Sequence, residues 1–249
     1  MKTKVYGHRG AAGTYPENTM LGFTKAVEMG IDGLEIDVHL TKDKKVVVIH
    51  DTTLDRTTSS SGRIKETKLY EMQHIGINQM YKSFEKYDNT WDKERIPQLN
   101  EFLTLYKDEN VDINVELKTR AEHYPGIEEE VYHVVSSLKL IDQVVFSSFN
   151  LETLVNLKNL DESVRVAYLS EEVPENPGAF IKEHDLEALH LSFNDVMEKK
   201  EELTEIAESL RVWLVNDEES VKPLLQMGVG AIITDYPEMV LKIRSEYYL

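Results

Sequence analysis

The stretch GLEIDVHLTKDKKVVVIH, residues 33–50, decides the fold. Its two apolar runs, Gly33–Leu40 and Val46–Ile49, have the composition of β-strands, and only residues 41–45 separate them. Parallel neighbours in a sheet need a crossover of about a dozen residues, which this connection does not provide. We therefore predict that the two strands form an antiparallel hairpin.

The register of this hairpin predicts where His50 lies. If the turn is centred near the middle of the connection, Val46 pairs with Leu40, and His50 then falls beside Ile36. The histidine would return along the hairpin to the level of Glu35. Its location near that carboxylate thus follows from the length of the loop.

Outside the hairpin, short β-branched runs alternate with amphipathic stretches. The further strand candidates are Lys4–Gly7, Asp112–Leu117, Gln143–Ser147, Arg165–Leu169, Ala188–Leu191, Arg211–Val215 and Ala231–Thr234. The helix candidates are Thr19–Met29, Leu99–Asp108, Gly126–Leu138, Leu151–Leu160, Pro177–His184, Met197–Ser209, Glu218–Met227 and Pro237–Tyr247. Such alternation is typical of a parallel sheet covered by helices. With the hairpin strand set aside, eight parallel strands remain, and we predict an α/β fold: a TIM (β/α)8 barrel with one extra antiparallel strand. A doubly wound open sheet is the alternative, but no glycine-rich dinucleotide turn supports it.

The chain length suits one barrel domain. We expect residues 1–249 to form a single domain with a small inserted subdomain at about residues 52–95. That insertion contains Ser59-Ser60-Ser61-Gly62 and several tyrosines, and it has no long periodic segment. Because loops of this length in compact domains are usually functional, we expect it to lie over one end of the barrel.

Composition excludes several classes of function. Cysteine is absent, which removes disulfides, thiolate metal sites and a cysteine nucleophile. The formal net charge of −17 argues against nucleic-acid binding through a basic face. No signal-peptide or membrane-spanning stretch follows Met1-Lys2-Thr3-Lys4, so we expect a cytoplasmic monomer or homodimer without a stable membrane anchor. A phosphate ester substrate would need local cations or a metal to offset the negative charge of the protein.

Charged and titratable residues gather where the strands end. The first strand ends in Gly7-His8-Arg9-Gly10, and Glu35 and Asp37 share one face of the second because they are two residues apart. The strand after the insertion ends in Glu116-Leu117-Lys118. Chemistry in barrels of this type takes place at the carboxyl ends of the strands. We therefore expect these side chains to meet at one mouth of the barrel.

The residue types at this mouth are those of a hard-cation site. Three carboxylates without a thiolate suit Mg²⁺ or Ca²⁺, while Arg9 and Lys118 would add positive charge for a phosphoryl transition state. Histidine titrates near neutrality, so one of His8 and His50 can accept a proton while the other donates one. A single Glu-x-Asp pair or a single histidine is more often structural. Their coincidence at several strand ends is costly unless the charges pair or hold an ion.

These motifs resemble those of bacterial glycerophosphodiester phosphodiesterases over essentially the whole chain. The matching motifs, in order, are Gly7-His8-Arg9-Gly10, Pro16-Glu17-Asn18-Thr19, Glu35-Ile36-Asp37-Val38, Leu40-Thr41-Lys42-Asp43, His50-Asp51, Glu116-Leu117-Lys118, Ser148-Phe149, Trp213-Leu214-Val215-Asn216 and Thr234-Asp235-Tyr236-Pro237. Each motif is weak alone, but their order and spacing together are specific.

The resemblance implies a TIM barrel that hydrolyses glycerophosphodiesters to glycerol 3-phosphate and an alcohol, in glycerophospholipid catabolism. It also implies roles for individual positions. By this resemblance the general acid and base are His8 and His50, and the ligands of one divalent cation (Mg²⁺ or Ca²⁺) are Glu35, Asp37 and Glu116. The resemblance also implies that Arg9 and Lys118 contact the phosphate and that Phe149 and Trp213 line the glycerol pocket.

Some residues within the motifs have structural interpretations that we prefer. Asp235 with Glu238 three residues later is typical of a helix capping pair, and Pro237 suits the first turn of that helix. Asn18 and Thr19 can cap the first helix in the same way. Trp213 could equally be barrel packing, and His39 is treated as peripheral although it shares strand parity with the two carboxylates.

Two alternatives to this function stay open. A phospholipase C or D of similar fold would act on intact lipids, which requires an apolar rim that the acidic sequence does not favour. A non-catalytic barrel that binds phosphate esters would need no divalent metal for turnover. Within the enzyme hypothesis, the sequence does not choose the alcohol, the metal, the acid among the two histidines, or between attack by water and a cyclic phosphate intermediate.

Overall fold

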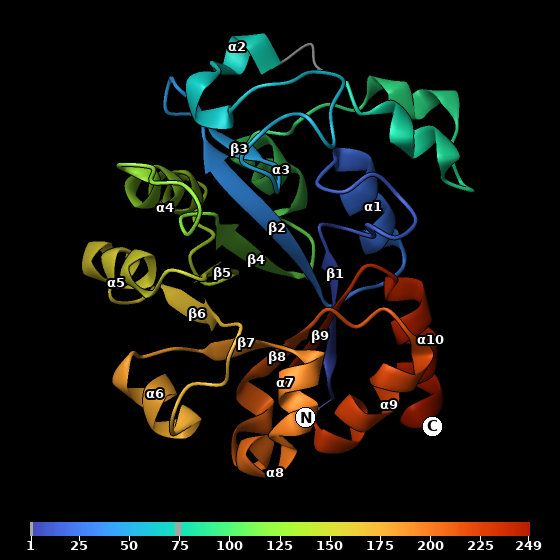
Figure 1. Ribbon diagram of the computed structural model, residues 1–249, viewed down its shortest axis with the longest axis vertical. Coiled ribbons are helices and arrows are strands. Elements are labelled where there is room, and N and C mark those ends of the chain that lie inside the picture. The colour runs from blue at the N-terminus through green and yellow to red at the C-terminus, as the bar shows by residue number, and fades with distance from the viewer. Residues whose placement is uncertain (1, 73–75) are drawn as a thin grey trace.

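Eight parallel strands close into a barrel in the computed structural model, which describes residues 2–72 and 76–249 (Figure 1). With the extra strand β3, the sheet comprises β1 (Lys4–His8), β2 (Gly33–Leu40), β3 (Val46–Val48), β4 (Asp112–Leu117), β5 (Val144–Ser148), β6 (Arg165–Leu169), β7 (Ala188–Ser192), β8 (Leu210–Trp213) and β9 (Ala231–Thr234). The order β1-β9-β8-β7-β6-β5-β4-β2 is closed by pairing of β1 with β2, and β3 is bonded outside the ring. The predicted TIM barrel with one extra strand is confirmed.

The β2–β3 hairpin has the predicted register. Leu40 pairs with Val46 and Val38 with Val48, antiparallel. The ladder continues beyond β3, because the N–H of Ile49 donates to the carbonyl of Asp37 over 3.0 Å. The hairpin therefore carries the chain back along β2, toward the interior residues of that strand.

Helices surround the barrel and cover the outer faces of its strands (Figure 1). They are α1 (Met20–Glu28), α3 (Leu99–Tyr106), α4 (Ile127–Ser137), α5 (Leu151–Leu160), α6 (Pro177–Glu183), α7 (Phe193–Glu198), α8 (Lys200–Leu203), α9 (Glu218–Met227) and α10 (Pro237–Tyr247). Aromatic rings of α1 and α3 interlock here, with the centroids of Phe23 and Phe102 4.7 Å apart. No helix in the described part of the chain is both long and apolar enough to cross a membrane.

The helix predicted over Met197–Ser209 is divided in the structure. It starts earlier, as α7, because the Ser192 hydroxyl accepts from the N–H of Asp195 and caps the first turn. Lys199, with φ −107° and ψ 28°, then separates α7 from α8, and the 3₁₀ turn η4 (Thr204–Ser209) leads into β8.

The amino-terminal end of the barrel is filled by paired charges. Arg211 lies over the ring of Tyr6, 5.3 Å from its centroid, and bonds Glu187. The Tyr6 hydroxyl donates to Asp112 over 2.6 Å, and Arg165 also bonds Glu187. Because these charges have partners of opposite sign, they close this end without a ligand.

The segment between β3 and α3 forms short turns around a small apolar core. Its elements are η1 (Ile64–Glu66), α2 (Leu69–Met72), η2 (Gln79–Ser83) and η3 (Asn89–Lys93), which lie beside β3 and α1 (Figure 1). The core cluster comprises Val47, Ile49, Leu54, Ile64 and Met72. Arg63 and Lys65 pair with the buried Glu122, which follows β4. The segment is thus tied to loops at the carboxyl end of the barrel.

We propose that this segment and the barrel unfold as one unit, and Ile64→Ala tests it. Ile64 is fully buried between the segment and β3, so the truncation should cost about 2–5 kcal/mol of unfolding free energy. Denaturant unfolding should keep a single transition with a lower midpoint. Val155→Ala on the outside of α5, where the side chain is 45% exposed, should change the unfolding free energy by less than about 0.5 kcal/mol. A second transition that alone moves with Ile64→Ala would contradict the proposal.

Candidate active site

A tight turn after β1 holds His8 and Arg9 at the mouth of the barrel. The N–H of Gly10 donates to the carbonyl of Gly7 over 3.3 Å, and Arg9 and Gly10 adopt φ values of 51° and 94°. A Cβ atom on Gly7 would lie 2.2 Å from the carbonyl oxygen of Gly10, so the turn needs glycine there. It directs the N–H of Arg9 to the Glu35 carboxylate, 3.1 Å away.

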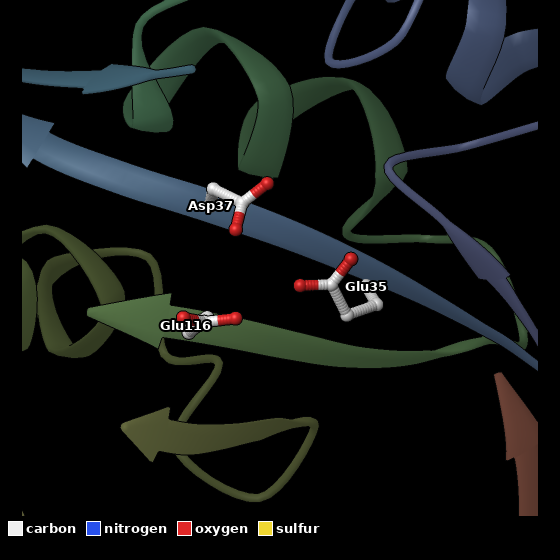
Figure 2. A group of neighbouring side chains, drawn as sticks. All are labelled: Glu35, Asp37 and Glu116. Atoms are coloured by element: carbon white, nitrogen blue, oxygen red, sulfur yellow. The ribbon is translucent and has the colours of Figure 1, made fainter. Parts of the chain in front are cut away.

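Three carboxylates from β2 and β4 form one buried cluster (Figure 2). Glu35 and Asp37 share the inner face of β2, and Glu116 is paired with Asp37 in the parallel register. One oxygen from each lies within 4.8 Å of the others, and each residue is at most 7% exposed. The three residues predicted as metal ligands therefore lie together.

The charge of the cluster is only partly compensated. The Nε of Arg9 lies 3.2 Å from Asp37, and the Nζ of Lys118 lies 2.7 Å from Glu116 and 3.4 Å from Asp37. Burial opposes ionisation of Asp37, but the charges of Lys118 and Arg9 outweigh it and hold the pKa of that carboxyl below its usual range. Burial and the charges of Asp37 and Glu116 raise the pKa of Glu35 well above its usual value. A cation bound at the cluster would remove this penalty.

The donor set fits a hard divalent cation. All three side chains present oxygen, and the Oδ1 of Asp37 is buried without a hydrogen-bond partner among the described residues. Carboxylate oxygens are the ligands that Mg²⁺ and Ca²⁺ prefer. Glu35, Asp37 and Glu116 are thus the residues that could hold such an ion.

His8 is held by an aspartate that we expected to cap a helix. Its Nδ1 lies 2.6 Å from Asp235, whose other carboxylate oxygen accepts from Asn216 over 2.6 Å. The capping interpretation of Asp235 with Glu238 is wrong: α10 follows Tyr236 without a side-chain cap, and Glu238 pairs with Lys86. Asp235 directly follows β9, at the mouth of the barrel, where its carboxylate contacts His8 and not a helix N–H.

His50 forms a second histidine–aspartate pair at the same cavity. Its Nδ1 lies 2.7 Å from Asp51, and Arg56 holds Asp51 through two hydrogen bonds of 2.8 Å. Arg56 also bonds Glu17, which in turn accepts from Arg9 over 2.9 Å. Residues of the inserted segment and of the β1–α1 loop therefore support the same site, a link that the sequence analysis missed.

His39 supports His50 through a hydrogen bond to its backbone, so the interpretation of His39 as peripheral is wrong. Its Nε2 lies 2.9 Å from the backbone carbonyl of His50, and its Nδ1 lies 2.7 Å from the Tyr124 hydroxyl. A carbonyl only accepts, so Nε2 carries the proton and Nδ1 accepts from the tyrosine. Burial lowers the pKa of His39 to about 4, which keeps the ring neutral in this role.

The Asn18-Thr19 pair divides between capping and the site. Thr19 caps α1, because its hydroxyl accepts from the N–H of Gly22 over 3.1 Å, as predicted. Asn18 does not cap the helix. It is buried and donates to Asp37 over 2.9 Å, where it restrains the carboxylate.

A cavity of about 340 Å³ opens beside the cluster. Both histidines line it together with Arg9 and Lys118. The rings of Phe149 and Trp213, predicted as pocket residues, also line it and meet edge to face with centroids 6.0 Å apart. The structure thus brings all the predicted site residues to one mouth of the barrel. Two histidines, a carboxylate cluster that could hold a cation, and two cationic side chains around a cavity can activate a phosphoryl group and stabilise charge on it.

Comparison with known proteins identifies close matches. The model of the glycerophosphoryl diester phosphodiesterase family matches residues 8–239. A glycerophosphodiester phosphodiesterase from Bacillus altitudinis is 36% identical, with 98% of this chain and 99% of the relative covered. One from Caldanaerobacter subterraneus subsp. tengcongensis is 35% identical over 98% of each chain. The structure of an Oleispira antarctica phosphodiesterase in complex with the product sn-glycerol-3-phosphate superposes with a TM-score of 0.83, at 27% identity over 97% of this chain and 96% of that one.

Divalent cations should stabilise the protein through the carboxylate cluster. Saturating Mg²⁺ or Ca²⁺ should raise the Tm of the chelator-treated protein by about 5 °C, because an ion that binds only the folded state stabilises it. Glu35→Gln removes one ligand charge and should lose most of this rise in differential scanning calorimetry, whereas Glu246→Gln, exposed on α10, should retain it. An equal rise in the Glu35→Gln variant would exclude the cluster as the binding site.

Proposed function

The chain belongs to the glycerophosphoryl diester phosphodiesterase family, and from that premise we propose how this glycerophosphodiester phosphodiesterase works. We propose that it hydrolyses glycerophosphodiesters to glycerol 3-phosphate and an alcohol, with His8 and His50 as general acid and base. The observation that carries this proposal is the pair of histidine–aspartate contacts, whose two histidines line one cavity beside a buried carboxylate cluster. We assign the reaction to glycerophospholipid catabolism, because phospholipids that have lost their acyl chains are glycerophosphodiesters.

Both histidines have the tautomer that this chemistry requires. Hydrogen bonds from His8 and His50 help to lower the pKa values of Asp235 and Asp51 although burial opposes ionisation, so both aspartates are carboxylates that only accept. Nδ1 of each histidine therefore carries a proton, and Nε2 is left to exchange one with the substrate. The same arrangement orients the catalytic histidine in serine hydrolases.

In the proposed reaction the two histidines together accept one proton and donate one proton. One histidine accepts the proton of the attacking oxygen as that oxygen bonds to phosphorus. The other histidine donates a proton to the alcohol oxygen as its bond to phosphorus breaks. The attacking oxygen belongs to water or, in a cyclic route, first to the glycerol 2-hydroxyl.

Positive charge at the cluster supports a phosphoryl group at this position. Burial would lower the pKa of Lys118, but Asp37 and Glu116 outweigh burial and raise it, so the ammonium stays charged beside the cavity. Arg9 is cationic on the same wall. When bound, a divalent cation held by Glu35, Asp37 and Glu116 would supply further charge to offset a phosphoryl oxygen.

Glycerophosphocholine turnover tests the proposal. Purified protein should release glycerol 3-phosphate and choline, EDTA should abolish the release, and Mg²⁺ or Ca²⁺ should restore it. His8→Asn and His50→Asn should each lower kcat by about 10²–10⁴-fold, because general acid–base catalysis contributes that much. His133→Asn, exposed on α4, should leave kcat unchanged. Turnover that persists in EDTA, or that favours lipid vesicles over glycerophosphocholine, would refute this assignment.

Asp235 is a positioning residue, and its substitution should show whether it orients His8 or contributes to substrate binding. Asp235→Asn leaves an amide that does not fix the Nδ1–H tautomer of His8, so kcat should fall by about 100-fold with KM nearly constant. The matched variant Asp161→Asn, at the half-buried carboxyl end of α5 and outside the residues that line the cavity, should behave as the wild type. Steady-state kinetics on glycerophosphocholine measure both constants. A change in KM alone would mean that Asp235 acts on binding and not through His8.

A further inference from the structure

His190 is a buried histidine inside the barrel that no part of the proposed mechanism uses. It lies on β7, in register with Leu169 of β6 and Arg211 of β8. The residue is 0% exposed, and neither ring nitrogen has a hydrogen-bond partner among the described residues. Because buried polar groups are nearly always hydrogen-bonded, an unpaired imidazole here indicates a missing partner.

The imidazole forms part of the wall of the 340 Å³ cavity. His8, Glu35 and Glu116 line this cavity from β1, β2 and β4, while the wall on the side of His190 is mainly apolar. That wall is made by the side chains of Phe149, Leu169, Trp213, Leu214 and Ile233. Asn114 and Glu171 also line the cavity, and Glu171 is paired with Arg120. A group that extends from the phosphate past the apolar side chains would meet carbon surface and the edge of the His190 ring.

A second cavity lies beside the first and could receive the other ester arm of the substrate. It has about 440 Å³, and its lining includes Thr52, Thr53 and Arg120. His50 and Lys118 line both cavities. A phosphate held at these shared residues would direct one ester arm of a diester into each cavity. The smaller cavity, with His190 and its apolar side chains, suits the arm common to all substrates, and the larger one suits the variable alcohol.

We propose that His190 hydrogen-bonds a hydroxyl of the glycerol arm and so selects glycerol among alcohols of similar size. This inference rests on the proposed function, and it adds a specificity-determining residue to the site.

The chemistry of the ring matches that of a hydroxyl. Burial and the charge of Arg211 lower the pKa of His190 well below its usual value, so the ring is neutral, with one donor and one acceptor nitrogen. A hydroxyl can serve either nitrogen. Asn114, another polar residue of the wall, is already engaged: it accepts from Arg211 over 3.3 Å and donates to Ser147 over 2.9 Å. The three carbons of glycerol would lie against the apolar side chains.

Calorimetric titration with two matched monoesters tests this role. The ligands are sn-glycerol 3-phosphate and n-propyl phosphate, which has the same three carbons without hydroxyls, each titrated at one fixed concentration of Mg²⁺. The wild type should bind glycerol 3-phosphate more tightly. His190→Leu should weaken that binding by about 10-fold or more and leave propyl phosphate binding unchanged, because only the first ligand loses a hydrogen bond. His190→Gln, which can donate and accept, should recover part of the difference.

Control variants keep the outcome decisive. His133→Leu on the exposed side of α4 should match the wild type with both ligands. His190→Met serves as a second apolar variant should the branched leucine impair folding, with the Tm of each variant measured first. Equal weakening of both ligands, or no weakening of either, overturns the inference. A wild type that releases no glycerol 3-phosphate from glycerophosphocholine would instead contradict the proposed function, so the two failures are distinguishable.

Discussion

Three like charges buried within a few ångströms are the constraint on which the mouth of this barrel depends. Glu35, Asp37 and Glu116 repel one another in a region where water cannot screen them. Arg9 and Lys118 offset two of the three charges. The glycine-dependent turn after β1 places Arg9 at the cluster. Lys118 follows β4 two residues after Glu116 and therefore lies on the same face as that carboxylate. The cluster thus has one carboxylate more than the cations that contact it, and the raised pKa of Glu35 reflects its burial and this incomplete compensation.

The two histidines differ in how the fold holds them. His8 belongs to a barrel strand, and its aspartate directly follows the adjacent strand β9, so the sheet fixes the positions of both. His50 lies beyond the end of a three-residue strand and needs more support. His39 holds its backbone, and Asp51 holds its ring with the help of Arg56 from the inserted segment. In the proposed mechanism, the insertion would therefore act on His50 through Arg56 and Asp51, in addition to lining the second cavity with Thr52 and Thr53.

The sequence predicted features that depend on chain geometry and missed those that depend on side-chain approach in space. The hairpin register followed from a five-residue connection, and the meeting of the carboxylates followed from strand parity. The role of Asp235 did not follow, because capping and histidine orientation need the same residue type just before a helix. The signal available was its place after β9, beside Asn216 after the neighbouring strand β8. The contact of Arg56 with Glu17, 39 residues earlier, has no local pattern at all.

The two ends of the barrel solve the problem of interior charge in opposite ways. At the amino-terminal end, Arg211, Arg165 and Asp112 sit in contacts with opposite charges or a hydroxyl, so that end is complete without a ligand. At the carboxyl end the charges of the cluster do not balance. A molecule with formal charge −17 repels a phosphodiester at long range, so attraction must arise within the last few ångströms. Arg9 and Lys118, which line the cavity, are the cations that can supply that attraction, so the proposed substrate site lies where the folded chain is electrostatically least satisfied.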